Sequence, residues 1–391
     1  MARRVRSGLE ALLADPRPLR GLRFGLVCNA SSVTAGLAHA SVALRGLRSR
    51  GARLVALFGP EHGIAADAQD LVEVGHSRDR ETGLPVHSLY GETRAPTPAM
   101  LEGLDAVVFD VQDVGSRYYT FVYTLLHVME ACAREGRRVV VLDRPNPIGG
   151  DVVEGNVLDP DYRSFVGLHP LAVRHGMTVG ELALMFQLEL GLHGDLVVVP
   201  MRGWRRRMAY EETGLPWVLP SPNMPTVDTA FVYPGGCLIE GTNLSEGRGT
   251  TRPFELVGAP WLDGPALARA LDKERLPGVG FRATSFTPTF QQHAGAPCHG
   301  VQVHVDDRRR FRSFLTYLLL VHHARRQDEE RFAWREPPYE YERVRLPIDI
   351  LCGTDRVRRA IEAGVSPRRL RPAWEKDEAA FRARRARYLL Y

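Results

Sequence analysis

The segment AVVFDVQDVGSRYYTFVYTLLHVMEACAREGRRVVVLD, residues 106–143, decides the fold of this chain. It begins and ends with apolar, β-branched runs at 106–111 and 138–143, and neither run alternates with polar residues. Strands of this kind are buried on both faces, as in a parallel sheet that helices cover. The residues between them, 120–138, have the pattern of a helix. The segment therefore predicts a strand–helix–strand unit.

The same pattern continues on both sides of this unit. Further buried strands and helices are predicted at 23–28, 39–51, 53–58, 178–191 and 196–200. The second of the added helices opens with Thr178 and Glu181 at the spacing of a capping box. Regular alternation of strand and helix predicts an open, doubly wound α/β domain with a parallel sheet.

A proline-rich stretch at 214–236 ends this pattern. It carries too many prolines for a helix or a central strand, so we expect it to lead into a second domain. Beyond it, 281–288 and 300–307 alternate as half-exposed strands do, and 311–326 has the pattern of an amphipathic helix. These elements indicate a smaller α+β domain. We place the two domains at 1–228 and 229–391.

Composition excludes several classes of protein. The chain has 391 residues and a net charge of +5, but its arginines are spread out, so we expect no nucleic-acid partner. It has no apolar run of membrane-spanning length and no apolar signal-peptide core. We therefore expect a cytoplasmic protein, or a secreted or periplasmic one if the true start lies upstream. The five cysteines are scattered without a CxxC pair, which argues against disulfides and zinc.

Polar and ionisable residues follow four of the predicted strands. They are Asn29 and Ser31; Glu61 and His62; Asp110, Asp113, Arg117, Tyr118 and Tyr119; and Asp143, Arg144 and Asn146. In an open parallel sheet, ligands bind beyond the carboxyl ends of the strands, where the strand order reverses. We therefore expect these residues to converge on one crevice. Taken singly, each also has a structural explanation as a helix cap, an ion-pair partner or a core aromatic residue.

Glu61 is the strongest candidate for acid–base chemistry among them. It lies in a stiff turn, Gly59-Pro60-Glu61-His62-Gly63, directly after a buried strand. A carboxyl group at such a place loses solvation, which raises its pKa toward neutrality and suits it to deliver a proton. The adjacent His62 can hydrogen-bond to Glu61 or to a ligand, or serve only structure.

A second group of charged residues lies in EGTNLSEGRGTTRPFE, residues 240–255. Four charged residues sit here among glycines and small polar residues: Glu240, Glu246, Arg248 and Arg252. Their loop faces either solvent or a cleft between the domains. The chain has no GxGxxG after its first strand and no P-loop, GxSxG or HExxH motif. A metal site built from His62 and the three aspartates is chemically possible, but no spacing requires it. We expect no cofactor and no metal.

Six ordered stretches carry a resemblance to a known family. They are FGPEHGIAAD, DVQDVGSRYYT, DRPNPIGG with VEGNVLD, RHGMTVGELA, PSPNMPT and LSEGRGTTRPFE. Together they resemble the NamZ-type peptidoglycan exo-β-N-acetylmuramidases, and the resemblance covers nearly the whole chain. It implies a Rossmann-like N-terminal domain without a nucleotide, a smaller C-terminal α/β domain and an active cleft between them. The implied reaction releases a non-reducing-terminal N-acetylmuramic acid from peptidoglycan fragments.

The resemblance also implies roles for particular residues. The family's motif glutamate falls on Glu61, which suits the proton donor that glycoside cleavage needs, and its second acidic motif falls on Glu246. Glu246, Asp113 or the substrate's acetamido oxygen can supply the second group. A site that selects muramic acid should offer an arginine to its lactyl carboxylate, and the candidates are Arg117, Arg144, Arg248 and Arg252. Tyr118 or Tyr119 can provide an apolar platform for the sugar.

Three alternatives stay open on the sequence. One is a lyase-type cleavage of the same sugar, and another is a sugar-binding protein without turnover. The third is a metal-dependent hydrolase. The expected partner in each case is a peptidoglycan-derived saccharide, and the sequence does not predict an oligomeric state.

Overall fold

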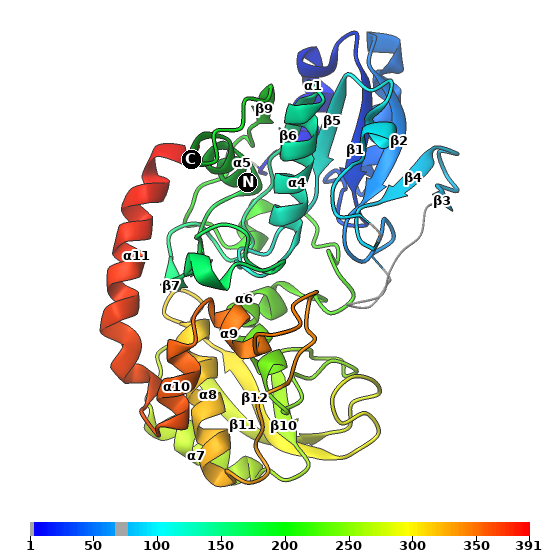
Figure 1. The fold of residues 1–391 in the computed structure, drawn as a ribbon. Helices are drawn as coiled ribbons and strands as arrows, with labels where there is room; N and C mark the ends of the chain where they lie inside the picture. The colour runs from blue at the N-terminus through cyan, green and yellow to red at the C-terminus, as the bar shows by residue number, and fades with distance from the viewer. Residues whose placement is uncertain (1–3, 67–76, 92) are drawn as a thin grey trace.

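A computed structural model describes residues 4–66, 77–91 and 93–391. Its N-terminal domain is built on a seven-stranded sheet in the order β3-β4-β2-β1-β5-β6-β9 (Figure 1). The strands are β1 (Arg23–Cys28), β2 (Arg53–Gly59), β3 (Ser77–Arg78), β4 (Pro85–Ser88), β5 (Ala106–Asp110), β6 (Arg138–Leu142) and β9 (Leu196–Val199). All neighbouring pairs are parallel except β3 with β4. The open parallel sheet is confirmed, and its strand order reverses between β1 and β5.

Helices cover both faces of this sheet. They are α1 (Gly8–Ala14), α2 (Ala40–Arg45), α3 (Pro98–Leu101), α4 (Phe121–Arg134) and α5 (Val179–Glu189). Apolar residues of α1 and α2 pack with Val108 of β5, whereas those of α4 and α5 pack with its neighbours Val107 and Phe109. Alternate strand residues therefore serve two cores, as a doubly wound fold requires. The capping box of α5 is present, with Thr178 Oγ1 accepting from Glu181 N at 3.3 Å.

The C-terminal domain is built on a three-stranded antiparallel sheet in the order β10-β12-β11. Its elements are α6 (Val227–Gly236), β10 (Leu256–Ala259), α7 (Gly264–Lys273), β11 (Val279–Phe286), β12 (Cys298–Val305) and α8 (Ser313–Gln327). The two predicted strands and the helix after them are confirmed. However, α8 is buried around most of its circumference rather than amphipathic, because α6 and α7 also pack against it.

The prediction that the proline-rich stretch forms no helix is wrong at its end. Helix α6 includes Pro234. Thr226 caps the helix, its Oγ1 accepting from Thr229 N at 3.2 Å. Pro234 lies in the last turn, so the missing proline N–H removes little of the helix's hydrogen bonding. The local rule against proline fails here because the helix ends soon after it.

Several segments join the two domains. The hairpin of β7 (Glu154–Val157) and β8 (Ala172–Arg174) meets α8, and Glu154 Oε1 accepts from Phe314 N at 2.7 Å. After α9 (Pro347–Cys352) and α10 (Arg356–Glu362), the long helix α11 (Arg371–Arg385) runs back along the molecule and packs on β7 (Figure 1). No observation tests a boundary at residue 228, and this division stays a prediction.

All five cysteines are buried and free, so the expectation of no disulfide framework is confirmed. Among the residues that the structure describes, no helix combines the length and the apolar composition needed to cross a bilayer.

Candidate active site

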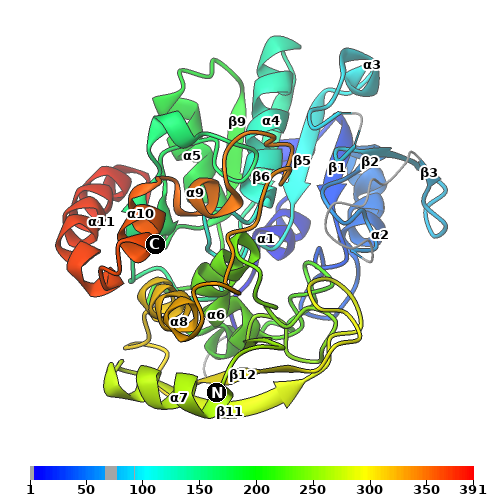
Figure 2. The same cartoon turned by 60° about the horizontal axis from the view of Figure 1, so that its bottom comes forward.

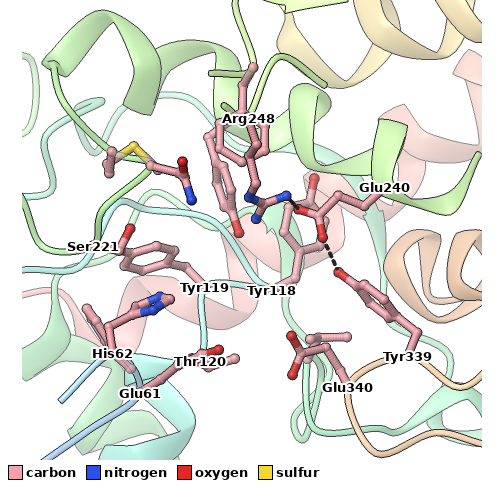
Figure 3. Close-up of a pocket in the computed structure, with 16 residues that line it drawn as sticks. Glu61, His62, Tyr118, Tyr119, Thr120, Ser221, Glu240, Arg248, Tyr339 and Glu340 are labelled. Carbon is pink, nitrogen blue, oxygen red and sulfur yellow. Dashed lines mark hydrogen bonds and ion pairs between the residues drawn. The ribbon is translucent and has the colours of Figure 1, made fainter. Parts of the chain in front are cut away.

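A pocket lies between the two domains, beyond the carboxyl ends of β2 and β5 (Figure 3). Its lining includes Glu61, His62, Tyr118, Tyr119, Thr120, Ser221, Asn223, Tyr233, Glu240, Arg248, Tyr339 and Glu340. The lining residues from Glu61 to Thr120 belong to the N-terminal domain. Those from Tyr233 to Glu340 belong to α6 and the chain that follows it. The pocket therefore lies where strand order reverses, as ligand sites of open sheets do.

Glu61 is held at the rim of the sheet by a tight turn. Its side chain is 6% exposed and accepts a hydrogen bond from the Thr120 hydroxyl, directly before α4. Gly63 N donates to Pro60 O at 2.9 Å, and His62 and Gly63 both have positive φ angles, 68° and 75°. A left-handed histidine is uncommon and marks a backbone fixed by its surroundings. The stiff turn predicted from the sequence is present, and it points Glu61 into the pocket.

Aromatic side chains form much of the pocket wall. Tyr119 meets Tyr233 edge to face, with ring centroids 5.6 Å apart, and the Tyr118 hydroxyl donates to the carbonyl of Pro234 in α6. Burial raises the pKa of both Tyr118 and Tyr119 well above the usual range, so both stay neutral donors. These contacts join the loop after β5 to the C-terminal domain.

Arg248 connects three acidic and phenolic groups on the opposite side. Its Nη1 lies 2.8 Å from Glu240 Oε1 and 3.1 Å from Glu246 Oε1, and Tyr339 donates to Glu240 Oε2 at 2.8 Å (Figure 3). Burial raises the pKa of Glu246, with the charge of Glu240 adding to this effect and Arg248 opposing it. Glu246 itself lies behind Arg248 and is not among the residues that line the pocket around Glu61.

Other predicted site residues lie in the sheet's own polar network instead. Asp110 and Arg144 form a buried bidentate pair, with N–O distances of 2.6 and 2.8 Å. Asp143 accepts from Thr178 Oγ1 at 2.8 Å and from Gly180 N at 2.8 Å, which fixes the start of α5 against β6. Burial raises the pKa of Asp143. None of the three predicted residues lines the pocket.

Arg117 is wholly buried and connects the β7–β8 region to α9 through hydrogen bonds. Its guanidinium donates to the carbonyls of Asn156 and Leu171, both at 3.0 Å, and of Leu351 in α9 at 2.8 Å. Burial lowers its pKa. Its three carbonyl partners, and its absence from the pocket lining, indicate a structural role.

The remaining predicted residues also fall outside the pocket lining. Asp113 accepts from Gly115 N at 2.7 Å, and its Oδ2 lies 3.6 Å from His175 Nε2. These contacts shape the loop after β5.

The other residues make local contacts. Asn29 Oδ1 accepts from Ser31 N at 3.0 Å. Asn146 donates to Met177 O at 3.0 Å, and Arg252 pairs with Glu255 at 3.2 Å while half-exposed.

Sequence reasoning did not select several residues that line the pocket. Ser221 and Asn223 stand in PSPNMPT, a motif already singled out, so this signal was available. Thr120 follows the tyrosine pair. Glu240 was named in the second charged stretch, but without a predicted role. Tyr339 and Glu340 stand in PPYEYE, where nothing in the local sequence distinguishes them from surface residues.

Comparison with known proteins identifies the family. The family model described as exo-beta-N-acetylmuramidase NamZ, N-terminal, matches residues 24–228, and the C-terminal model of the same family matches residues 231–391. The chain belongs to the NamZ family. It is 46% identical over 389 residues to the peptidoglycan beta-N-acetylmuramidase NamZ of Bacillus subtilis, covering 99% of this chain and 92% of that protein.

Two solved structures are similar to this chain along its whole length. Two crystal structures of DUF1343 family proteins from Bacteroides fragilis superpose with TM-scores of 0.90 and 0.79, at 35% and 32% identity. Each comparison covers at least 99% of both chains. The two-domain α/β architecture is therefore shared along the whole length of the chain.

The described part of the chain holds no group of three or more His, Cys, Asp or Glu side chains arranged as metal ligands. The three aspartates once considered with His62 are separated into different networks: Asp110 binds Arg144, Asp113 holds its own loop, and Asp143 caps α5.

Proposed function

We propose that this chain is an exo-acting β-N-acetylmuramidase that hydrolyses the bond of a non-reducing-terminal N-acetylmuramic acid in peptidoglycan fragments. One observation carries the proposal: in a chain of the NamZ family, Glu61 of the N-terminal domain and Arg248 of the C-terminal domain line the same pocket. An acid for the leaving oxygen and a cation for a carboxylate-bearing sugar thus occupy one site.

Glu61 acts as the general acid. It is buried, its turn is fixed, and Thr120 orients its carboxyl group, so its proton can be aimed at one oxygen of the substrate. Positioned acids of this kind accelerate reactions by about 10²- to 10⁴-fold. The edge-to-face pair Tyr119 and Tyr233 supplies the apolar wall on which a sugar ring packs.

Arg248 recognises the lactyl carboxylate of muramic acid. Of the four arginines considered, Arg117, Arg144 and Arg252 are engaged outside the pocket, and Arg248 lines it. Arg248 already has two carboxylate neighbours. Burial raises the pKa of Glu246, while the charge of Arg248 lowers it.

The direct test uses a disaccharide of N-acetylmuramic acid and N-acetylglucosamine in heavy-oxygen water. Hydrolysis releases free N-acetylmuramic acid with solvent oxygen on its anomeric carbon, and we expect this product with or without a chelator. A lyase would leave the anomeric carbon without solvent oxygen. Tight binding in a calorimetric titration, without any product, would identify a binding protein instead.

The assignment of Arg248 has a matched control in the same loop. Arg248→Met should lower kcat/KM for the muramic acid disaccharide about 10- to 100-fold, the loss of a charge-assisted contact. The same variant should change little with a substrate that ends in N-acetylglucosamine, which lacks the lactyl group. Arg252→Met should leave both rates near those of the unaltered chain. Equal losses on both substrates would remove Arg248 from this role.

A further inference from the structure

Three carboxylates line the pocket in the described part of the chain: Glu61, Glu240 and Glu340. Glu240 serves the network around Arg248, since one oxygen lies 2.8 Å from Arg248 and the other accepts from Tyr339. Glu246 stands behind Arg248 and outside this lining. Glu340 is also buried at the pocket wall, and a titratable group that lines a cleft is a candidate for a catalytic role.

Glu340 lies at the tip of a strained turn. Tyr339 and Glu342 exchange backbone hydrogen bonds of 2.9 and 2.8 Å, and the two residues between them have positive φ angles, 46° for Glu340 and 66° for Tyr341. Two successive left-handed residues that are not glycine cost free energy. Such strain persists where the surroundings over-determine it, and it concentrates at functional sites.

The residues on both sides of Glu340 anchor the turn to different domains. Tyr339, through its hydroxyl, binds Glu240 of the C-terminal domain. Tyr341 is 43% exposed and lies against the N-terminal domain, with its ring centroid 5.4 Å from that of Phe165 and the Arg94 guanidinium carbon 4.3 Å from its centroid. Figure 2 shows this segment, which precedes α9, extending from the smaller domain toward the larger sheet. The carboxylate between the two anchors is thus held in place.

Glu340 faces Glu61 across the pocket. Figure 3 shows Glu61 with Thr120 on one side and Glu340 on the other. Tyr90 is buried in the N-terminal domain and interacts electrostatically with both carboxylates. Burial raises the pKa of its hydroxyl, and the negative charges of Glu61 and Glu340 raise this pKa further. Two carboxylates on opposite walls are the arrangement that glycoside hydrolysis uses.

We propose that Glu340 is the second catalytic carboxylate of this site, acting at the anomeric carbon of the sugar whose leaving oxygen Glu61 protonates. Glu61 gives its proton to the glycosidic oxygen, and the bond from that oxygen to the anomeric carbon breaks, leaving its electron pair on the oxygen. A water oxygen bonds to the anomeric carbon while Glu340 takes the proton that the water loses. Solvent then returns both carboxyl groups to their starting states.

This inference rests on the proposed function and is tested on the same disaccharide. Glu340→Gln, which keeps the shape of the side chain, should lower kcat about 10²- to 10⁴-fold with KM and melting temperature little changed. Glu336→Gln is the control, because Glu336 is an exposed residue of the same segment outside the pocket. Glu246→Gln should act mainly on KM, through Arg248.

A second variant protects the test against misfolding. Azide has no proton to lose, so it should bond to the anomeric carbon without help and restore turnover to Glu340→Ala, giving a glycosyl azide. More than a tenth of the original kcat in Glu340→Gln, or no azide product from folded Glu340→Ala, would overturn the assignment. An unaltered chain that releases no N-acetylmuramic acid would instead overturn the proposed function, and this role with it.

Discussion

Two polar regions lie at the carboxyl ends of the central strands, and they differ in what surrounds their charges. In the network beneath the sheet edge, Asp110 pairs with Arg144, and Asp143 accepts from hydroxyl and backbone donors of α5. In the pocket, Glu61 and Arg248 come from different domains and line one cavity. Both regions are buried and rich in charge, but the first is closed by its own partners.

The difference teaches that charge at a strand end is a weak sign of function by itself. A buried pair whose members satisfy each other holds the fold, and removing one member leaves an uncompensated charge. A carboxyl group at a cavity wall has room for a ligand beside it. Variants that separate activity from stability therefore test the comparison directly.

The largest effect is expected at Glu61. Glu61→Gln should lower kcat for the muramic acid disaccharide about 10²- to 10⁴-fold, because the amide cannot protonate the leaving oxygen. The melting curve should not change, since the glutamine still accepts from Thr120. Product release and thermal unfolding, measured on one preparation, check both statements. Full activity in a normally folded variant would refute the role of Glu61.

The opposite outcome is expected at Arg144. Arg144→Met leaves the buried Asp110 carboxylate without its ion-pair partner. This should reduce the free energy of unfolding by about 3–5 kcal/mol. Activity per folded molecule should stay close to normal. Urea unfolding with activity assays below the transition measures both, and the double variant Asp110→Leu, Arg144→Met should recover part of the loss. A stable but inactive Arg144→Met would move Arg144 into the site.

A pH effect is expected at Glu154, where β7 meets α8. Burial raises the pKa of this carboxyl from 4.5 to about 7. The folded chain therefore favours the protonated form, and this contribution to stability is complete below the unfolded pKa and is lost as pH rises through the folded one. Glu154→Gln, which cannot titrate, should lose less stability across that range than the unaltered chain, by roughly 3 kcal/mol. Unfolding curves at pH values spanning the two pKa values give the difference, and parallel pH profiles would contradict it.

A smaller effect is expected at Thr120. Thr120→Val removes the hydrogen bond to Glu61 and should lower kcat about 10-fold, equivalent to about 1.4 kcal/mol. Thr124→Val, the same change one turn further along α4, is buried but outside the pocket and should leave kcat unaltered. If both variants lose activity equally, the cause is the packing of α4 rather than the orientation of Glu61.

The smallest effect is expected at Arg252. Its pair with Glu255 is half-exposed, and such pairs contribute about 0–1 kcal/mol. Arg252→Ala should therefore change neither stability nor turnover appreciably. A clear loss of kcat/KM would show that the loop carrying Arg248 brings a second arginine to the substrate.

Much of the fold is predictable from sequence because buried parallel strands leave uninterrupted apolar runs. The five runs at 23–28, 53–58, 106–111, 138–143 and 196–200 all became strands of one sheet. Strands β3 and β4 have the sequences SR and PVHS, which are not apolar runs and so leave no such signal. Helix α6 was missed because the effect of a proline depends on its place in the helix.

The site was predictable in part, for a related reason. Glu61, Tyr118 and Tyr119 follow strands whose ends the sheet gathers at one edge, so topology alone places them together. Asp110 and Arg144 follow the same rule, and the sequence does not reveal that they pair with each other. Glu340 reaches the pocket only because Tyr339 and Tyr341 anchor its turn to two domains, and no local pattern encodes such long-range contacts.

The buried guanidinium of Arg117 has a consequence for how a saccharide reaches the pocket. It holds carbonyls of the β7–β8 region and of α9 at once, and the apolar core runs without a break from one domain to the other. A wide opening between the two domains would separate the Arg117 guanidinium from its carbonyl acceptors and would also divide that core. We therefore expect a saccharide to enter the pocket without a large separation of the two domains.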